Sequence, residues 1–563
     1  MGAAPPHLVR AMSCGILGLC ALVYANTLVG EFIWDDVSSI LLHEHVQDPA
    51  AITQLFTEDQ HAFAGGQGNF YRPLLAVTFM FDFWLSNNGP TIMESPEVIA
   101  QLSPFIFHLD SILWHALACI ALLFLLRNLE ASTPVQIALP LIYAIHPLHT
   151  EAVTYISGRA DSMSAAFILS GLAFATAIQP RRPVLFAGLT LTCFLAGLLS
   201  KESTLIFPVL LILTLIAANK IHAIKFSLRH GVMMIGSILI LVLYAVLRLG
   251  PLNFGSDSPA PESTFGERMV ETVQSFAYYI ELIIAPGNLH MERTLVHATT
   301  MTTVFGALML LALIVSIGIR LQRRQYRIAL GAAWFLAGWL PISGIIPLNA
   351  PMAEHWMYVP MVGFLLVLLS VLFEVIPAYF STLTSQRVQA VFGIVVLIWG
   401  ISLTFVSIER NADWRTNRSI YEATIRENPD TTRVNYNLAV AHQYTINNPV
   451  GAKRHYTSII NAYAERKADL PSGQQNFWDE EIQSHLSMGQ IYLDQARYGD
   501  AIQHFQLVAS IVPDDRNKEN VGRALMGMGK CLLASGDRVQ ADKRFAQAVQ
   551  HAPRLQPEID RLL

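Results

Sequence analysis

Charged residues are scarce in this chain: 14% of its 563 residues are Asp, Glu, Lys or Arg, whereas 53% are hydrophobic. Soluble domains carry roughly 25% charged residues, so this composition excludes an ordinary water-soluble protein. The net charge of -5 gives no support to nucleic-acid binding. We therefore interpret the chain as a membrane protein that crosses the bilayer several times.

Cysteine is also scarce, with 5 residues in the whole chain. Cys14, Cys20, Cys119 and Cys193 fall in apolar segments, which leaves Cys531 alone in the C-terminal part. This distribution does not indicate a disulfide framework. A bulky leucine directly before Cys20 is a poor lipoprotein cleavage site, so we expect the first apolar segment to be an uncleaved span.

Three motifs of other enzyme classes are missing. The acidic pair Asp35-Asp36 is not the Asp-x-Asp arrangement that binds nucleotide sugars through a metal, and no Gly-rich phosphate loop follows a strand. A soluble nucleotide donor is therefore disfavoured. His146, His149 and Glu151 do not have the spacing of a helical metalloprotease, and Pro147 breaks the helix that would align them. We do not expect zinc-dependent hydrolysis.

Long apolar runs are what the chain has in abundance. A helix needs about 20 apolar residues to cross roughly 30 Å of hydrocarbon. We predict an all-α fold in which residues 1–408 form a polytopic transmembrane bundle of about 11 spans. The spans are placed near 10–29, 105–126, 135–150, 160–179, 183–199, 202–219, 229–248, 302–320, 328–346, 356–377 and 387–408.

The distribution of basic residues orients the bundle. With Arg10 on the cytoplasmic side, alternate loops carry the clusters of Lys and Arg, in accordance with the positive-inside rule. The longer loops 31–104 and 250–300 are then on the outer side, and so is everything after residue 408. Residues 75–85 and 267–286 are predicted to be helices that lie on the outer interface.

A helical repeat fills residues 409–563. Four positions recur exactly one repeat later, with a period of 40 residues: Gly489, Ala501, Phe505 and Pro513 match Gly529, Ala541, Phe545 and Pro553. The internal spacing is typical of the tetratricopeptide repeat (TPR), whose usual period is about 34 residues. We predict a TPR α-solenoid of about three repeats plus a leading half, with a concave groove that binds a protein partner.

Polar residues gather at one end of the predicted spans. The clusters are Trp34-Asp35-Asp36, Tyr71-Arg72, His146 to Glu151, Gly158 to Asp161, Lys201-Glu202 and Glu354-His355. Threading the chain back and forth places all of them on the outer face. This arrangement is typical of a membrane enzyme with one interfacial active site.

The chemistry of these residues indicates group transfer at a membrane surface. An adjacent carboxylate pair, Asp35 and Asp36, can deprotonate a weakly acidic hydroxyl, with one carboxylate as base and the other orienting it or holding a metal. Arg72, Arg159 and Lys201 can bind a phosphate. The alternatives are a solvated helix end for the acids and simple ion pairing for the cations.

The motifs, in this order, resemble the transmembrane and TPR O-mannosyltransferase family (TMTC) of the GT-C superfamily. The matching segments are 34–36, 71–74, 146–153, 157–161, 200–202, 353–360 and 413–414. The resemblance covers almost the whole chain, and 146–161 is its most specific part. Family members usually carry Arg where this chain has His355, and the animal members have longer repeat arrays, which suggests a bacterial relative.

The resemblance implies a mechanism. A lipid-linked sugar, mannose or a similar hexose on undecaprenyl or dolichyl phosphate, would be transferred with inversion to a hydroxyl of Ser or Thr in a secreted or periplasmic protein. Asp35 would be the base, supported by Asp36, with a divalent metal at this pair as an open option, and Arg72, Arg159 and Lys201 would bind the phosphate. The cavity would be shaped, or protons relayed, by His146, His149, Glu151, Asp161, Glu202, Glu354 and His355.

Two alternatives stay open at this point. One is a GT-C transferase that acts on a glycan or lipid acceptor, and the other is a non-catalytic, membrane-anchored TPR scaffold. The expected location is a bacterial inner membrane, with the active site and the repeats in the periplasm, or the endoplasmic-reticulum membrane facing the lumen if the protein is eukaryotic.

Overall fold

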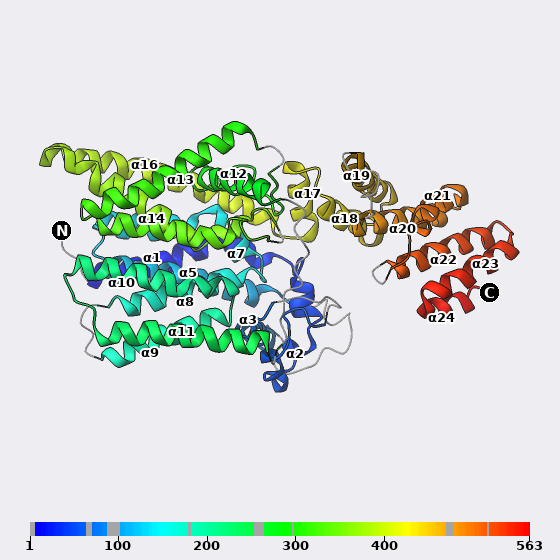
Figure 1. Ribbon diagram of the computed structural model, residues 1–563, viewed down its shortest axis with the longest axis horizontal. Helices are drawn as coiled ribbons and strands as arrows, with labels where there is room; N and C mark the ends of the chain where they lie inside the picture. The colour runs from blue at the N-terminus through cyan, green and yellow to red at the C-terminus, as the bar shows by residue number, and fades with distance from the viewer. Residues whose placement is uncertain are drawn as a thin grey trace. The chain divides into compact units, whose positions relative to one another are not determined.

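A computed structural model describes the protein at residues 6–63, 70–86, 102–177, 182–250, 252, 264–295, 298–348, 350–468, 478–514 and 517–563. Helices make up the regular structure of these residues, and an isolated bridge between Arg293 and Met352 is their only β pairing. The predicted all-α class is therefore confirmed. The chain divides into two compact units, Met1–Ser419 and Ile420–Leu563 (Figure 1).

The first unit is a bundle of helices joined by loops and short helical turns. Its helices are α1 (Pro6–Val23), α2 (Glu44–Gln47), α3 (Pro73–Ser86), α5 (Phe105–Asn128), α6 (Thr133–Ile145), α7 (Thr150–Thr154), α8 (Arg159–Ala175), α9 (Pro183–Leu198), α10 (Phe207–Ile221), α11 (Leu228–Leu249), α12 (Phe265–Ile284), α13 (Thr300–Gln322), α14 (Tyr326–Trp339), α15 (Pro360–Ser370) and α16 (Thr382–Asp413). Parts of the predicted outer loops 31–104 and 250–300 lie outside the described residues.

Six helical segments of this unit are long and apolar enough to cross a membrane. They are Phe105–Asn128, Glu202–Ile221, Leu228–Leu249, Thr300–Gln322, Pro360–Tyr379 and Thr382–Asp413. Five further apolar helices are shorter: His7–Val23, Pro73–Ser86, Thr133–Ile145, Pro183–Leu198 and Tyr326–Ile342. The protein is thus an integral membrane protein, whereas the number of about 11 spans and their orientation stay predictions.

The helices differ in how much of their apolar surface is buried. Helix α5 packs against α1, α6 and α8, and Leu122 and Leu123 near its middle are fully buried. In α11 and α13, by contrast, Leu239 and Leu308 are exposed. Exposed apolar side chains along a whole helix are what a lipid-facing surface requires. Helices α11 and α13 therefore have the composition of peripheral, lipid-contacting helices.

Helices α14 and α15 approach each other closely because both carry glycine at the crossing. A Cβ on Gly331 would lie 2.8 Å from the carbonyl oxygen of Gly363, and a Cβ on Gly363 would lie 2.5 Å from that of Gly331. Small residues at helix crossings let the backbones of membrane helices come together. Trp334 adds a hydrogen bond of 2.9 Å from its indole nitrogen to the carbonyl oxygen of Val359.

Short helices and turns gather at one end of the bundle, where α2, α3 and α7 lie (Figure 1). Helix α6 ends at Ile145 because His146 is extended and Pro147 follows it. His146 accepts a hydrogen bond from the backbone N–H of Leu148, so it caps the turn that leads into α7. A Cβ on Gly158 would lie 2.3 Å from the carbonyl oxygen of Glu151, so only glycine fits where α7 passes into α8.

The second unit contains the repeat positions. Its helices are α18 (Thr432–Val440), α19 (Pro449–Ala468), α20 (Asp479–Asp494), α21 (Tyr498–Ala509), α22 (Lys518–Ala534), α23 (Arg538–His551) and α24 (Gln556–Asp560), and α17 (Asn417–Glu427) crosses the boundary between the units. From α18 to α23 each helix packs against the next.

Equivalent positions of the repeat make equivalent contacts. A Cβ on Gly489 would meet the ring of Phe505 at 2.6 Å, and a Cβ on Gly529 would meet the ring of Phe545 at 2.5 Å. Both rings therefore lie directly on a glycine of the preceding helix. The packing recurs with the period of the sequence, while the assignment to the TPR class and the number of repeats stay predictions.

Candidate active site

Asp36 is a structural carboxylate. It is fully buried, and its Oδ1 accepts hydrogen bonds from the backbone N–H of Ser157 at 2.8 Å and from its hydroxyl at 2.6 Å. Its Oδ2 accepts a third from the N–H of Ile33 at 3.0 Å. Burial raises the pKa of Asp36 to about 7, against the opposing effect of these hydrogen bonds. Asp36 thus ties the turn between α7 and α8 to the chain that follows α1.

Asp35 has the opposite environment. It is half-buried, and its backbone N–H donates to the hydroxyl of Tyr155 at 3.1 Å. Among the described residues, its carboxylate has no hydrogen-bond or ion-pair partner. The side chain of Asp35 is therefore free to accept a proton from a bound molecule.

His61 is a neighbour of Asp35 that the motifs did not indicate. Its Nδ1 lies 2.8 Å from the hydroxyl of Ser38 and 3.2 Å from that of Ser39. Burial lowers the pKa of His61, the charge of Asp35 raises it, and the charge of Arg72 lowers it. His61 therefore lies within electrostatic reach of both a predicted base and a predicted phosphate ligand.

Arg72 leads from this group to the end of α9. Its Nε lies 3.0 Å from Oε2 of Glu202, and its Nη1 donates at 3.3 Å to Gln60, which in turn donates to Ser39. Arg248 of α11, which sequence reasoning missed, lies 3.4 Å from Oε1 of the same Glu202. Two arginines thus share one carboxylate, and their guanidinium groups lie at the same point of the site.

Lys201 and Asp161 form a second ion pair beside the first. The Nζ of Lys201 lies 2.6 Å from Oδ2 of Asp161, at the start of α8. Lys201 directly precedes Glu202, so this pair and the Arg72 pair are adjacent along the chain. Asp35, Asp36, Arg72, Asp161, Lys201 and Glu202 thus belong to one connected group.

Arg159 is placed differently from the other predicted cations. Its guanidinium is fully buried and forms ion pairs with Asp82 of α3 at 2.5 Å and Asp110 of α5 at 2.9 Å. It also donates to the carbonyl oxygen of Phe107 at 2.6 Å and to Ser111 at 3.1 Å. A buried guanidinium with these partners does not fit the predicted contact to a phosphate, and it joins three helices instead.

A second polar group surrounds Glu354, in the short turn before α15. Glu354 is 2% exposed and contacts Arg293 at 2.9 Å and Arg410 of α16 at 3.4 Å, neither of which sequence reasoning indicated. Burial raises the pKa of Glu354, but the charges of Arg410 and Arg293 outweigh it and hold the pKa below its usual value. His355, the next residue, has its Nδ1 2.8 Å from Oε1 of Glu151.

The two predicted histidines of 146–149 lie in the interior. The Nε2 of His146 lies 2.9 Å from the carbonyl oxygen of Ile283 in α12. His149 is fully buried between the rings of Tyr143 and Tyr358, at centroid distances of 4.3 and 4.2 Å. Both of its ring nitrogens lack a hydrogen-bond partner among the described residues.

The two polar groups meet at the C-terminal end of α16. Asn411 accepts a hydrogen bond from Thr154 of α7 at 3.1 Å, and Arg410 beside it contacts Glu354. Trp414 stacks on Tyr155 at a centroid distance of 5.4 Å. The ends of α7, α16 and the turn before α15 therefore frame one polar region, next to the free carboxylate of Asp35.

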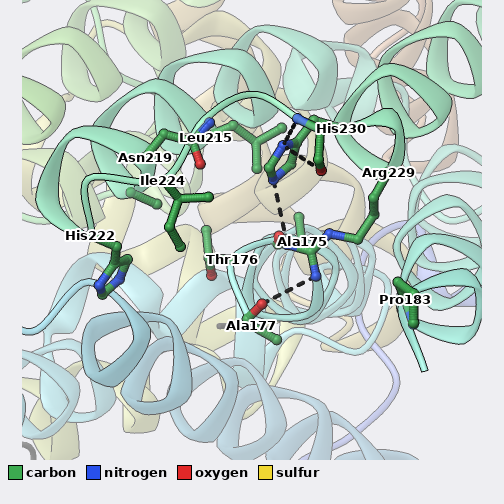
Figure 2. Close-up of a pocket in the computed structure, with 12 residues that line it drawn as sticks. Ala175, Thr176, Ala177, Pro183, Leu215, Asn219, His222, Ile224, Arg229 and His230 are labelled. Atoms are coloured by element: carbon green, nitrogen blue, oxygen red, sulfur yellow. Dashed lines mark hydrogen bonds between the residues drawn. The ribbon is translucent and has the colours of Figure 1, made fainter. Parts of the chain in front are cut away.

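A cavity of about 250 Å³ lies away from this region (Figure 2). It is lined by Ala175 and Ala177 at the end of α8 and by Arg229 at the start of α11. Arg229 donates to the carbonyl oxygens of Ala175 and Ala177, at 3.1 and 3.2 Å, and so caps the end of α8. Since α8 rises 1.5 Å per residue, Arg159 at its start lies about 24 Å away, so this cavity does not belong to the candidate site.

Comparison with known proteins finds relatives that are named protein O-mannosyl-transferases. The chain is 24% identical over 439 residues to protein O-mannosyl-transferase F38B6.6 of Caenorhabditis elegans, covering 75% of this chain and 59% of that protein. It is 21% identical over 588 residues to human protein O-mannosyl-transferase TMTC3, covering 96% of this chain and 60% of that protein. A third relative, human TMTC4, is 21% identical over 75% of this chain and 63% of its own length.

These coverages set the extent of the relationship. The chain spans about 60% of the length of the curated relatives it matches. No family model matches the chain. No solved structure matches it either. The alignments nevertheless extend over most of this sequence, and the chain is therefore a relative of the TMTC family of protein O-mannosyl-transferases.

Proposed function

We propose that the protein is a membrane glycosyltransferase that moves a hexose, mannose in the first instance, from a polyprenyl-phosphate carrier to a Ser or Thr hydroxyl of a protein. The names of the relatives support the transfer of mannose to protein. The observation that carries the proposal is the half-buried carboxylate of Asp35, which has no partner among the described residues and lies in a region that also holds the cations of Arg72, Arg248 and Lys201.

Asp35 acts as the general base. The acceptor hydroxyl attacks the anomeric carbon, the bond from that carbon to the phosphate oxygen breaks, and the proton of the hydroxyl passes to the carboxylate of Asp35. The polyprenyl phosphate leaves with the electrons of the broken bond, so the configuration at the sugar inverts. Asp36 supports this step indirectly. It holds Ser157, and thereby the turn that carries Tyr155, whose hydroxyl accepts a hydrogen bond from the backbone N–H of Asp35.

Arg72, Arg248 and Lys201 bind the donor phosphate. Arg72 and Arg248 share the carboxylate of Glu202, which brings two guanidinium groups together at one point. Arginine binds phosphate through parallel N–H donors, and lysine acts as a point charge. Arg159 is assigned a positioning role, since it holds the start of α8 on α3 and α5.

A divalent metal shared by the two aspartates does not fit this geometry. Both oxygens of Asp36 already accept hydrogen bonds from N–H and O–H groups, which point their protons where a cation would lie. Only Asp35 has a free carboxylate in the pair. We therefore derive no step through a metal at this position.

The second unit binds the protein acceptor, and both it and the active site face the periplasm or the lumen of the endoplasmic reticulum. Support comes from the recurring packing of α20 to α23, since stacked helical repeats present extended surfaces to partner proteins. Glycan and lipid acceptors are the competing possibility, and the acceptor assay below distinguishes them.

The test compares Asp35→Asn with the wild-type enzyme and with Arg127→Gln, a control at the far end of α5. Purified protein is incubated with a panel of polyprenyl-phosphate monosaccharides and with peptide, glycan and lipid acceptors, and the mass shift of each acceptor is measured. A positioned base contributes typically 10² to 10⁴ in rate, so Asp35→Asn should lose transfer by about that factor while the control keeps it. An active Asp35→Asn enzyme would refute the assignment of the base, and transfer only to glycan or lipid would refute the protein acceptor.

A further inference from the structure

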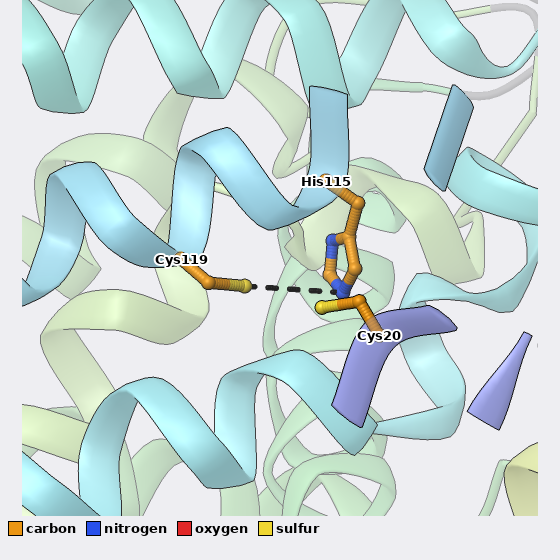
Figure 3. A group of neighbouring side chains, drawn as sticks. All are labelled: Cys20, His115 and Cys119. Carbon is orange, nitrogen blue, oxygen red and sulfur yellow. Dashed lines mark hydrogen bonds between the residues drawn. The ribbon is translucent and has the colours of Figure 1, made fainter. Parts of the chain in front are cut away.

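Three potential metal ligands meet inside the helical bundle, away from the residues assigned to sugar transfer. They are Cys20 of α1 and His115 and Cys119 of α5 (Figure 3). One ligand atom from each lies within 4.8 Å of the other two, and all three side chains are 0% exposed. His115 and Cys119 are four residues apart, so they lie on the same face of α5.

The spacing of these atoms is close to that of a tetrahedral zinc site. The Sγ of Cys119 lies 3.9 Å from Nε2 of His115. Bonds of about 2.3 Å from zinc to sulfur and about 2.0 Å to nitrogen place such a pair roughly 3.6 Å apart in a tetrahedron. His115 and Cys119 therefore need to move by only a few tenths of an ångström to coordinate a single ion.

Charge balance favours a divalent ion in this position. Two thiolates carry two negative charges, and a neutral imidazole adds none, so a zinc ion makes the site neutral as a whole. Burial of a neutral group in the bundle avoids the large cost of burying an isolated charge. A monovalent copper ion would leave one negative charge uncompensated in the same surroundings.

The residues around the site match the support that a metal-bound histidine needs. Such a histidine usually donates its second ring N–H to a fixed acceptor. The Nδ1 of His115 makes a hydrogen bond with the hydroxyl of Tyr358, which can accept that proton. Its Nε2 lies 3.0 Å from the carbonyl oxygen of Ala144. When the metal binds, coordination of this nitrogen replaces that contact.

A second histidine lies near the cluster, but its nitrogens are not within 4.8 Å of all three ligand atoms. The ring centroids of His149 and His115 lie 5.6 Å apart, and both nitrogens of His149 are buried without a partner among the described residues. A buried polar group without a hydrogen bond costs about 1 to 3 kcal/mol, and coordination removes that cost. Structural zinc sites are almost always closed by four protein ligands.

We propose that Cys20, His115 and Cys119 bind a structural zinc ion that fixes α1 against α5, and that His149 moves toward these three residues to become the fourth ligand. The metal has no part in the transfer step, since Cys20, His115 and Cys119 lie outside the group around Asp35. A closed site of this kind forms as the chain folds, because its ligands come from separate helices.

The test measures the metal content of the full-length protein after purification in a mild detergent. Inductively coupled plasma mass spectrometry should find about one zinc ion per chain in the wild type. Cys119→Ser and Cys20→Ser should each lower the zinc content at least tenfold. Cys14→Ser and Cys193→Ser, which change cysteines outside the cluster, should leave it unchanged.

X-ray absorption at the zinc edge of the wild-type protein gives a measurement that does not depend on the folding of any variant. It should show sulfur neighbours at about 2.3 Å together with nitrogen neighbours at about 2.0 Å. Zinc below one tenth of an equivalent in the wild type, a bound copper ion in its place, or a disulfide between Cys20 and Cys119 in the intact mass would each overturn the proposal.

Discussion

Two adjacent carboxylates of the same residue type have been given different properties by their surroundings. Asp36 is fully buried and accepts three hydrogen bonds, whereas Asp35 is half-buried and its carboxylate has no partner among the described residues. The backbone turn at Trp34, with a φ of 49°, precedes the pair. Asp36 therefore holds the loop in place, whereas Asp35 can act as a base.

The raised pKa of Asp36 predicts a specific dependence of stability on pH. Its pKa is about 7 in the folded protein, against 3.8 for an ordinary aspartate, so the folded state binds the proton more tightly than the unfolded state. The stabilising effect of this proton is complete below about pH 4 and is lost as the pH rises through 7. Relative to wild type, Asp36→Asn should therefore gain thermal stability as the pH rises from 4 to 7.

The measurement is the midpoint of thermal unfolding in detergent for both proteins across this pH range. Asp35→Asn, the same change at the neighbouring position, serves as the matched control. A difference between Asp36→Asn and wild type that does not vary with pH would contradict the shifted pKa.

The sequence allowed the polar residues of the site to be identified, but not their partners. Asp35, Arg72 and Glu202 stand out because they interrupt apolar segments, and motif spacing placed them at span ends. The pairing of Arg72 with Glu202 joins residues 130 positions apart, and nothing in local spacing indicates it. Arg248 and Arg410 were missed for the same reason, since each lies at the end of an otherwise apolar helix as ordinary flanking cations do.

Among the helices, α8 is attached to its neighbours by an unusual polar contact. Arg159 in its first turn pairs with Asp82 of α3 and Asp110 of α5, within a region that is otherwise apolar. The ring of Phe79 lies 5.0 Å from the guanidinium carbon and covers it. The sequence placed Arg159 in a functional motif. Its burial could not be predicted in the same way, because a buried guanidinium needs acidic partners, and these come from two other helices.

Loss of this contact should destabilise the bundle. Arg159→Lys keeps the charge but cannot bridge two carboxylates with a planar fork, and removing a partner from a buried ion pair costs about 3 to 5 kcal/mol. We expect the midpoint of thermal unfolding to fall by several degrees, with a loss of transfer that follows the loss of folded protein.

Arg127→Lys, at the other end of α5, is the control for this substitution and should unfold as the wild type does. The specific activity of the remaining folded Arg159→Lys protein separates the two roles. If folded protein of normal stability were obtained with a large increase in the KM for the lipid donor, Arg159 would contact the phosphate after all.

Helices were easier to predict than their membrane placement. Apolar segments of sufficient length located α5, α11, α13 and α16, and also the segments Glu202–Ile221 and Pro360–Tyr379 that contain α10 and α15; all six are long and apolar enough to span. Helix α6 contains only 13 residues, since Pro147 stops it, and a span of 16 residues was predicted there. Short helices of this kind are indistinguishable by composition from helices that only line the interior of a bundle.

At the scale of the whole molecule, the chain consists of two compact units that end and begin at Ser419 and Ile420. The composition predicted a change at residue 408, where the last apolar run ends. Helix α16 continues to Asp413, because Arg410 and Asn411 are held by Glu354 and Thr154 of the first unit. Polar residues of a helix end can thus belong to the unit that precedes them.

Removal of the second unit should weaken binding of the protein acceptor and leave catalysis intact. A chain that ends at Ser419 keeps all the described contacts of Asp35, Arg72, Lys201 and Glu354, so we expect it to fold in the membrane and to glycosylate a short acceptor peptide. Its KM for a full-length protein acceptor should rise about tenfold or more, with kcat little changed. An unchanged KM for that acceptor would show that the second unit does not bind it.

The two-residue segment Lys201-Glu202 has a consequence for how the molecule tolerates change. Lys201 is extended, with φ -160° and ψ 141°, so its side chain and that of the next residue leave the backbone on opposite sides. One reaches α8 through Asp161, and the other reaches Arg72 and Arg248. Insertion of a single residue directly before Lys201 would turn the lysine toward Arg72 and Arg248 and the glutamate toward Asp161, so alternation along the backbone constrains the length of this junction.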